Sequence, residues 1–300
     1  TNEIEEKDMV TLKNSELEVE LNAKGAEIIK IIGQHDHINY MWRRDPALWA
    51  SSAPILFPII GALHNDECLI DGKTYHMTQH GFSRHNEYMT HQLSDTCVEF
   101  ELTPNEDILK QYPYLFDLKV IYTLKENTLE CRCIVKNTDD KTIYFQIGGH
   151  PAFACPFMEH ESSNDYYVEF EKEETLDQKV IDVAHRAMSR ITKPFFDHER
   201  RFFVRQALLD NDAIVLKDFQ SSYVALKSIH HQKAIYFHME NYPHLGIWAS
   251  KHVGGLLALE PWNGHGDYID FHGEFKDKEG MIALEPQQEF TCMFAIEIRQ

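Results

Sequence analysis

The chain is poor in basic side chains. Its 300 residues contain 29 lysines and arginines against 48 aspartates and glutamates, which gives a formal net charge of −19 at pH 7. So large a negative excess repels the phosphates of nucleic acids and of anionic lipid surfaces. Nucleic acid and membrane are therefore not expected as partners.

Long apolar runs are also absent, and nothing approaches the length of a membrane-spanning helix. The first residues are acidic (Glu3, Glu5, Glu6), without the basic and then apolar pattern of a secretory signal. The six cysteines include no C-x-x-C pair of the zinc-binding kind. These absences predict a cytoplasmic location with reduced thiols.

Linkers and repeats are missing as well. No stretch rich in proline, serine or glycine divides the chain, and no internal repeat or low-complexity tract is found. All-β sandwiches often reach this length undivided. We therefore expect one domain over residues 1–300.

Short strand-like runs dominate what is present. Residues 15–22 place Leu17, Val19 and Leu21 on one face, and Cys131 and Cys133 share a face of another run, as core residues would. The other runs cover residues 26–32, 96–102, 116–124, 128–136, 143–147, 166–170, 213–216, 223–227, 234–238, 245–249, 256–259 and 289–298. So many strands without intervening helices predict an antiparallel all-β sandwich or barrel.

Helical signals are few and short. They cover residues 46–50 and residues 106–111, where Thr103 offers a cap. Residues 53–60 are mostly apolar but contain Pro54 and Pro58. Because proline cannot donate to a strand ladder, this segment is expected to pack against the sheet rather than form a central strand.

Two strand ends carry the chemistry that stands out. His150 follows two glycines and precedes Pro151, which holds it in an extended geometry. Glu260 ends the apolar run 256–259, where a carboxylate is costly to bury unless it is paired or titrated, and Trp262 follows it. A histidine, a carboxylate and an aromatic face suit acid–base chemistry on a sugar. The alternatives are a core histidine and an exposed strand-end glutamate.

Other candidates are weaker when taken alone. His80 and Arg84 share one short segment, and Arg84 suits sugar hydroxyls or a phosphate but equally a surface salt bridge. Asp212 reads as a turn residue, and Trp248 as core or as a sugar platform, with core favoured. Glu285 also precedes a proline and is a rival base, but no aromatic–glycine sequence follows it, so a final turn is favoured there.

The eighteen histidines raise the alternative of a metal site. Histidines two apart on a strand share a face, as in metal-binding β-barrels. The pairs His35/His37 and His230/His231, however, lie between strand-like runs, where exposed turns are favoured, and the preference is weaker for His64 and His76. No ordered ligand set emerges, so neither a metal nor another cofactor is expected.

Several motifs together resemble the aldose 1-epimerase (galactose mutarotase-like) superfamily, most closely its LacX-like branch. They are PILFPIIGAL, DGKTYHMTQHGFSR, NTDDKTIYFQIGGHPAFACP, YPHLGIW, LALEPWNGHGD and IALEPQQEF, in that order along nearly the whole chain. The resemblance implies a β-supersandwich of antiparallel sheets with few short helices. It implies a mutarotase that interconverts the α and β anomers of a free hexose, without a cofactor.

The resemblance also implies roles for single residues. His150 matches the family's general acid, Glu260 its general base, and His80 the second histidine at the ring-oxygen side. Asp212 matches the aspartate that binds substrate hydroxyls, and Trp248 falls at a substrate-contacting position. The chain departs from the family at Ala62, where members commonly carry a substrate-binding arginine, and Arg84 is expected to replace part of its role.

Three other functions stay open. One is a non-catalytic carbohydrate-binding protein with the same fold. Another is a hexose-6-phosphate 1-epimerase, which needs further basic residues near the pocket, and the last is a metal-dependent cupin-like enzyme. The enzyme hypothesis was expected to show His150 and Glu260 facing each other at a distance that spans a sugar. The partner is a small-molecule sugar; the sequence is compatible with a homodimer and does not fix the oligomeric state.

Overall fold

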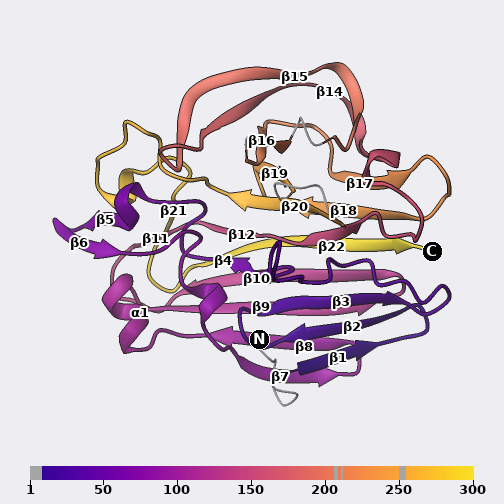
Figure 1. Cartoon of the computed structure of the whole chain (residues 1–300). Helices are drawn as coiled ribbons and strands as arrows, with labels where there is room; N and C mark the ends of the chain where they lie inside the picture. The colour runs from indigo at the N-terminus through magenta and orange to yellow at the C-terminus, as the bar shows by residue number, and fades with distance from the viewer. Residues whose placement is uncertain (1–8, 206–208, 211, 250–254) are drawn as a thin grey trace.

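The structure is a computed structural model that describes residues 9–205, 209–210, 212–249 and 255–300. It is built almost wholly of antiparallel strands (Figure 1). A small sheet near the N-terminus has the order β1-β2-β3. Its strands are β1 (Met9–Lys13), β2 (Leu17–Asn22) and β3 (Glu27–Gly33).

The main sheet has fifteen strands among the described residues. Along its path run β4 (Ile55–Leu56), β12 (Ile147–Gly149), β20 (Gly255–Asn263), β19 (His244–Trp248), β16 (Ile214–Lys217), β14 (Tyr166–Asp182), β17 (Tyr223–Ser228), β18 (Ala234–Glu240), β22 (Glu289–Arg299), β10 (Thr128–Asn137), β9 (Phe116–Lys125), β8 (Cys97–Leu102) and β7 (Met89–Ser94). Beside this path, β13 (Ala152–Cys155) pairs with β20 and β15 (Ala187–Phe203) pairs with β14. The antiparallel all-β prediction is confirmed.

The sandwich forms where the small sheet covers one end of the main sheet. Residues of β9 and β10 alternate between buried and half-exposed, as a period of two requires, and Cys131 and Cys133 are both fully buried. The buried faces of β1–β3 and of β8–β10 belong to one apolar cluster. Tyr122 on β9 donates a hydrogen bond to the Ala26 carbonyl at 2.7 Å, which ties the two layers together.

A long two-stranded arm was missed by the sequence analysis. Strand β14 was expected only over residues 166–170 and β15 not at all, yet each is 17 residues long. Figure 1 shows them as a curved arch along one side of the molecule. Most β15 side chains are exposed, and most of the exposed ones are polar, so no alternating apolar signal marks the strand.

The helix predictions were half right. Residues Glu106–Gln111 form α1, but its cap is Asn105, whose side chain accepts from the Ile108 amide, and not Thr103. Residues 46–50 contain a turn over residues 46–48 and no helix: the Leu48 and Trp49 amides both donate to the Asp45 carbonyl. The side chains of Trp42 and Arg44 donate to the carbonyls of Trp49 and Ala50. No described helix has the length and apolar character that a membrane crossing needs.

Two predictions bear directly on the site. The proline-containing segment 53–60 supplies only the short edge strand β4, as expected. Strand β20, by contrast, runs past Glu260 to Asn263, so the prediction that Glu260 lies at a strand end is wrong.

Two small sheets complete the described fold. One pairs β5 (Glu67–Ile70) with β6 (Lys73–His76), and the other pairs β11 (Ile143–Phe145) with β21 (Ile282–Leu284).

Candidate active site

His150 and Glu260 meet because the neighbour of β20 is interrupted. Strand β13 pairs with the first part of β20, up to Ala258, and β12 pairs with its end, from Trp262. His150 and Pro151 form the break between β12 and β13. Pro261 lies opposite this break. Proline has no backbone N–H to donate, and on this side of β20 no paired strand residue requires one at this position. The break turns His150 toward the middle of β20, where Glu260 lies.

The two side chains are in direct contact. His150 Nε2 lies 3.2 Å from Glu260 Oε1, and the two residues are 8% and 1% exposed. The other carboxyl oxygen, Oε2, accepts from the indole N–H of Trp262 at 3.2 Å. His150 Nδ1 is buried and has no hydrogen-bond partner among the described residues. The alternative of an exposed strand-end glutamate is therefore wrong.

The surroundings favour one proton on the pair. Burial raises the pKa of Glu260 well above its ordinary value, and the nearby charge of Asp212 raises it further. Burial lowers the pKa of His150 to about 3, and the Arg84 charge adds to this. Both shifts favour the uncharged forms, a carboxylic acid beside a neutral imidazole. Two groups in contact whose pKa shifts favour one proton between them suit proton transfer.

His80 adds a histidine whose proton position is defined. Its Nδ1 accepts from the Gly61 amide at 3.0 Å, and its own amide donates to the Gly61 carbonyl at 2.9 Å. Burial lowers the pKa of His80 well below its ordinary value, with the neighbouring His150 contributing. A neutral ring that accepts at Nδ1 carries its proton on Nε2. The His80 and His150 ring centroids are 5.7 Å apart.

A cleft of about 430 Å³ holds all seven residues named from the sequence. Those seven are His80, Arg84, His150, Asp212, Trp248, Glu260 and Trp262. The volume lies in the range of small-molecule sites. Of the seven, Asp212 is exposed, and its Oδ1 accepts from the Ala213 amide at 2.7 Å.

Arg84 lines the cleft rather than pairing on the surface. Its Nη2 donates to the Gln79 carbonyl at 2.9 Å, and its Nε is buried without a hydrogen-bond partner among the described residues. Ala62 lines the same cleft. The guanidinium is therefore near the place where the family arginine is absent, as the compensation hypothesis requires.

The aromatic residues differ from expectation. Trp248 is half-buried at the cleft and not a core residue, because β19 directs it to the same sheet face as Glu260 of the neighbouring strand. Trp262 is only 5% exposed and packs over Gly246, so it holds Glu260 more than it offers an open stacking surface.

Sequence reasoning missed several lining residues, of which Trp49 and Arg186 matter most. Trp49 has its ring centroid 4.7 Å from that of His150 and 5.5 Å from that of Trp248, which makes it part of the aromatic wall. Arg186 comes from the tip of the β14–β15 arm. The false helix prediction hid Trp49, and the unrecognised arm hid Arg186; only the basic character of Arg186 was a signal.

The separation expected between His150 and Glu260 is wrong. They touch, whereas a gap that spans a sugar was expected. The expectation was too strict, because mutarotation acts on the ring oxygen and the anomeric hydroxyl, which are bonded to the same carbon. An acid and a base that serve these two oxygens can therefore lie side by side.

The histidines do not assemble into a metal centre in the described part of the chain, where no group of three or more suitable ligands is found. His230 and His231 lie in the turn between β17 and β18, as expected. Exposed Glu285 accepts from the Thr142 hydroxyl just after β21, away from the cleft lining. In the described part of the cleft, His150 and Glu260 are thus the histidine and carboxyl side chains that lie in direct contact.

The family model for aldose 1-epimerase matches residues 8–291 of this chain. The chain belongs to the aldose 1-epimerase family. Chromosomal protein LacX of Lactococcus lactis is 30% identical over 290 residues, covering 92% of this chain and 95% of that protein. A galactose mutarotase related enzyme of Lactobacillus acidophilus aligns with a TM-score of 0.93 at 29% identity, covering 97% of each chain. A galactose mutarotase-like protein of Lactobacillus casei aligns at 0.90 and 28%, covering 97% of this chain and 100% of that one.

These likenesses confirm the family and the LacX-like resemblance read from the motifs. They also extend over both the strands that carry the cleft and the strands of the small sheet, since the family match begins at residue 8.

Proposed function

We propose that this protein is an aldose 1-epimerase that interconverts the α and β anomers of a free hexose. The observation that carries the proposal is the His150–Glu260 contact inside a cleft, with one proton favoured on the pair. Mutarotation needs one proton delivered to the ring oxygen and one removed from the anomeric hydroxyl. A pair that holds a single proton can do both without changing its total charge.

Ring opening uses only the one proton held by the pair. Transfer from Glu260 to His150 makes an imidazolium and a carboxylate. His150 protonates the ring oxygen as the bond from that oxygen to C1 breaks, and Glu260 takes the anomeric hydroxyl proton as C1 becomes an aldehyde carbon. The pair is then a neutral imidazole and a carboxylic acid, the state that burial favours.

Closure reverses these roles. After rotation about the C1–C2 bond, the C5 hydroxyl attacks the other face of the aldehyde and gives its proton to His150. Glu260 returns its proton to the carbonyl oxygen, which becomes the anomeric hydroxyl. His80 Nε2–H donates toward the ring oxygen, Asp212 accepts from a sugar hydroxyl, and Trp49 and Trp248 contact the apolar face of the ring.

The test is anomer exchange measured by NMR or polarimetry on galactose, glucose and glucose 6-phosphate. Exchange accelerated by wild-type protein and lost in Glu260→Gln supports the enzyme. Equal exchange rates for the two proteins, with sugar binding retained, would leave a carbohydrate-binding protein instead.

One observation favours a second candidate, a hexose-6-phosphate 1-epimerase. Arg186 supplies the additional basic residue that such a substrate requires, in the same cleft as Arg84. Asp210 and Asp212 line the cleft too and oppose an anionic group, so the free hexose remains the first choice. Faster exchange of glucose 6-phosphate than of both free sugars would reverse that order.

A further inference from the structure

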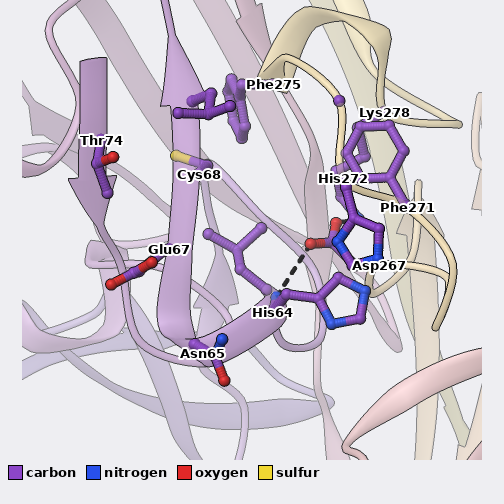
Figure 2. A pocket seen from close by; sticks show the side chains of 13 residues that line it. His64, Asn65, Glu67, Cys68, Thr74, Asp267, Phe271, His272, Phe275 and Lys278 are labelled. Atoms are coloured by element: carbon purple, nitrogen blue, oxygen red, sulfur yellow. Dashed lines mark hydrogen bonds and ion pairs between the residues drawn. The ribbon is translucent and has the colours of Figure 1, made fainter. Parts of the chain in front are cut away.

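A second buried acidic residue lies behind the cleft and takes no part in the proton transfers above. Lys278 Nζ donates to Asp267 Oδ1 at 2.7 Å, and the side chains are only 2% and 5% exposed. The pair borders a separate cavity of about 180 Å³, shown in Figure 2. Charges this deep are costly unless every partner is in place.

Asp267 joins segments from both sides of the cleft. Its Oδ2 accepts from the His64 amide at 3.1 Å, the contact drawn as a dashed line in Figure 2. Its own amide donates to the Ala62 carbonyl at 3.0 Å, and its carbonyl accepts from the Met188 amide at 2.7 Å. Ala62 and Met188 both line the cleft, one from the segment before β5 and one from β15 near the tip of the arm.

The held segment continues directly to His80. Gly61 precedes Ala62, and its amide is the donor to His80 Nδ1. Gly61 also packs on Gly266, the neighbour of Asp267, so closely that a Cβ on Gly61 would lie 2.8 Å from the Gly266 backbone. A shift of Asp267 therefore moves the amide that decides which nitrogen of His80 carries the proton.

We propose that Asp267, held by Lys278, is a positioning residue that acts through the Gly61–Ala62 segment to fix the orientation and tautomer of His80. The inference rests on the proposed function, since it gives the fixed His80 N–H a task at the sugar. The carboxylate has two acceptors in use, one for the ammonium and one for the His64 amide. Asparagine has the same shape but replaces one of these oxygens by an NH2 group, so one of the two donors would face another donor.

Nitrogen-15 NMR of the imidazole nitrogens tests the proposal without reference to activity. In wild-type protein, His80 should show a protonated Nε2 and an unprotonated Nδ1 that accepts a hydrogen bond. In Asp267→Ala the two tautomers should mix, and kcat for anomer exchange should fall about 10- to 100-fold, as expected when a reacting group is misplaced. Asp267→Asn keeps one acceptor oxygen, so it should recover part of the single His80 tautomer and part of kcat.

Matched controls are available on the neighbouring 3₁₀ turn, Phe275–Asp277. Asp277→Asn and Lys276→Met alter exposed residues of the same types and should change neither the His80 spectrum nor kcat. Should Asp267→Ala not fold, the variant carrying Asp267→Asn and Lys278→Met removes both charges while keeping the side chains' bulk, and the same spectrum is read on it.

The outcomes separate the two proposals. A folded Asp267→Ala protein with an unchanged His80 tautomer overturns the positioning role, whatever its activity. Wild-type protein without measurable exchange overturns the proposed function, while the tautomer comparison still decides the role of Asp267. If Asp267→Ala and the control Asp277→Asn lost the same amount of kcat, the inference would also be refuted, because any acidic residue of the region would then behave alike.

Discussion

Two buried acid pairs a short stretch of sequence apart behave in opposite ways. Asp267 meets Lys278, and both carboxylate oxygens have donors, one from the ammonium and one from a backbone amide. Glu260 meets His150 at the cleft, its second oxygen has only the Trp262 indole, and His150 Nδ1 has no partner among the described residues. The first pair is held in one geometry by these donors, while burial lowers the pKa of Lys278. The second is suited to give and take a proton.

The difference teaches what makes a buried acid reactive. Full hydrogen bonding stabilises the charged form and holds it in one geometry, whereas burial with few donors favours the uncharged form. The pKa of Glu260 is therefore raised by burial. A buried glutamate that lacks donors and touches an imidazole is the group from which a proton can move.

The largest expected effect breaks the cleft pair. Glu260→Gln keeps the size and part of the hydrogen bonding but cannot carry a transferable proton. Anomer exchange should fall about 10²- to 10⁴-fold while sugar binding stays within a few-fold. Exchange is followed by NMR and binding by calorimetry.

Glu285→Gln is the matched control, since Glu285 also precedes a proline but is exposed and lies outside the cleft lining. It should exchange sugar like the wild type. An equal loss of activity in both variants would end the assignment of Glu260.

The next largest effect is expected when the Asp267–Lys278 pair is broken, and it should appear in the free energy of unfolding. Lys278→Met leaves Asp267 as an unpaired buried charge and should lower the free energy of unfolding by about 3–5 kcal/mol. Adding Asp267→Asn should restore most of that loss, because the uncompensated charge is gone. Urea denaturation measures both, with exposed Lys276→Met as the control; a Lys278→Met protein as stable as this control would refute the contrast.

The two pairs should also differ in their response to pH. Because the folded-state pKa of Glu260 is raised, the folded state keeps a proton that the unfolded state loses above about pH 4.5. Wild-type stability should therefore fall, relative to Glu260→Gln, by up to about 1.4 kcal/mol per pH unit as pH rises from there toward the folded-state pKa. Parallel stability curves for the two proteins would show that Glu260 is ionised when folded.

Activity should follow the single-proton state of the same pair. A second proton enters only below the lowered pKa of His150, about 3, and the last leaves only above the raised pKa of Glu260. The plot of log kcat/KM against pH should be flat between these limits after subtraction of the spontaneous rate. A sharp decline centred near pH 6.5, the ordinary histidine pKa, would contradict the assignment.

The smallest effect concerns the arginine at the cleft. Arg84→Ala should raise KM about tenfold, the loss of one charged hydrogen bond to the sugar, with a smaller change in kcat. Adding Ala62→Arg should restore much of the affinity if Arg84 replaces the family arginine. No change in KM for Arg84→Ala would refute that compensation.

Much of the site could be predicted because its residues belong to local motifs with a chemical meaning. His150 between glycines and proline, Glu260 after an apolar run, and His80 with Arg84 are visible in the chain, and all line one cleft. The strands of the core were also predictable, since period-two alternation is written in residues such as those of β9 and β10. The arm was not, because most β15 side chains are exposed and β14 depends on long-range pairing with β15, β16 and β17.

By itself the sequence determined the all-β class and the family, and it singled out the residues proposed here for acid–base chemistry. Only the tertiary structure decided that His150 touches Glu260, that Trp49 and Arg186 join the cleft, and that Asp267 links its walls. Local pattern records which residue types a strand or turn needs. It cannot record which interrupted strand lies beside which continuous one, and that long-range pairing sets the 3.2 Å contact and the proton held there.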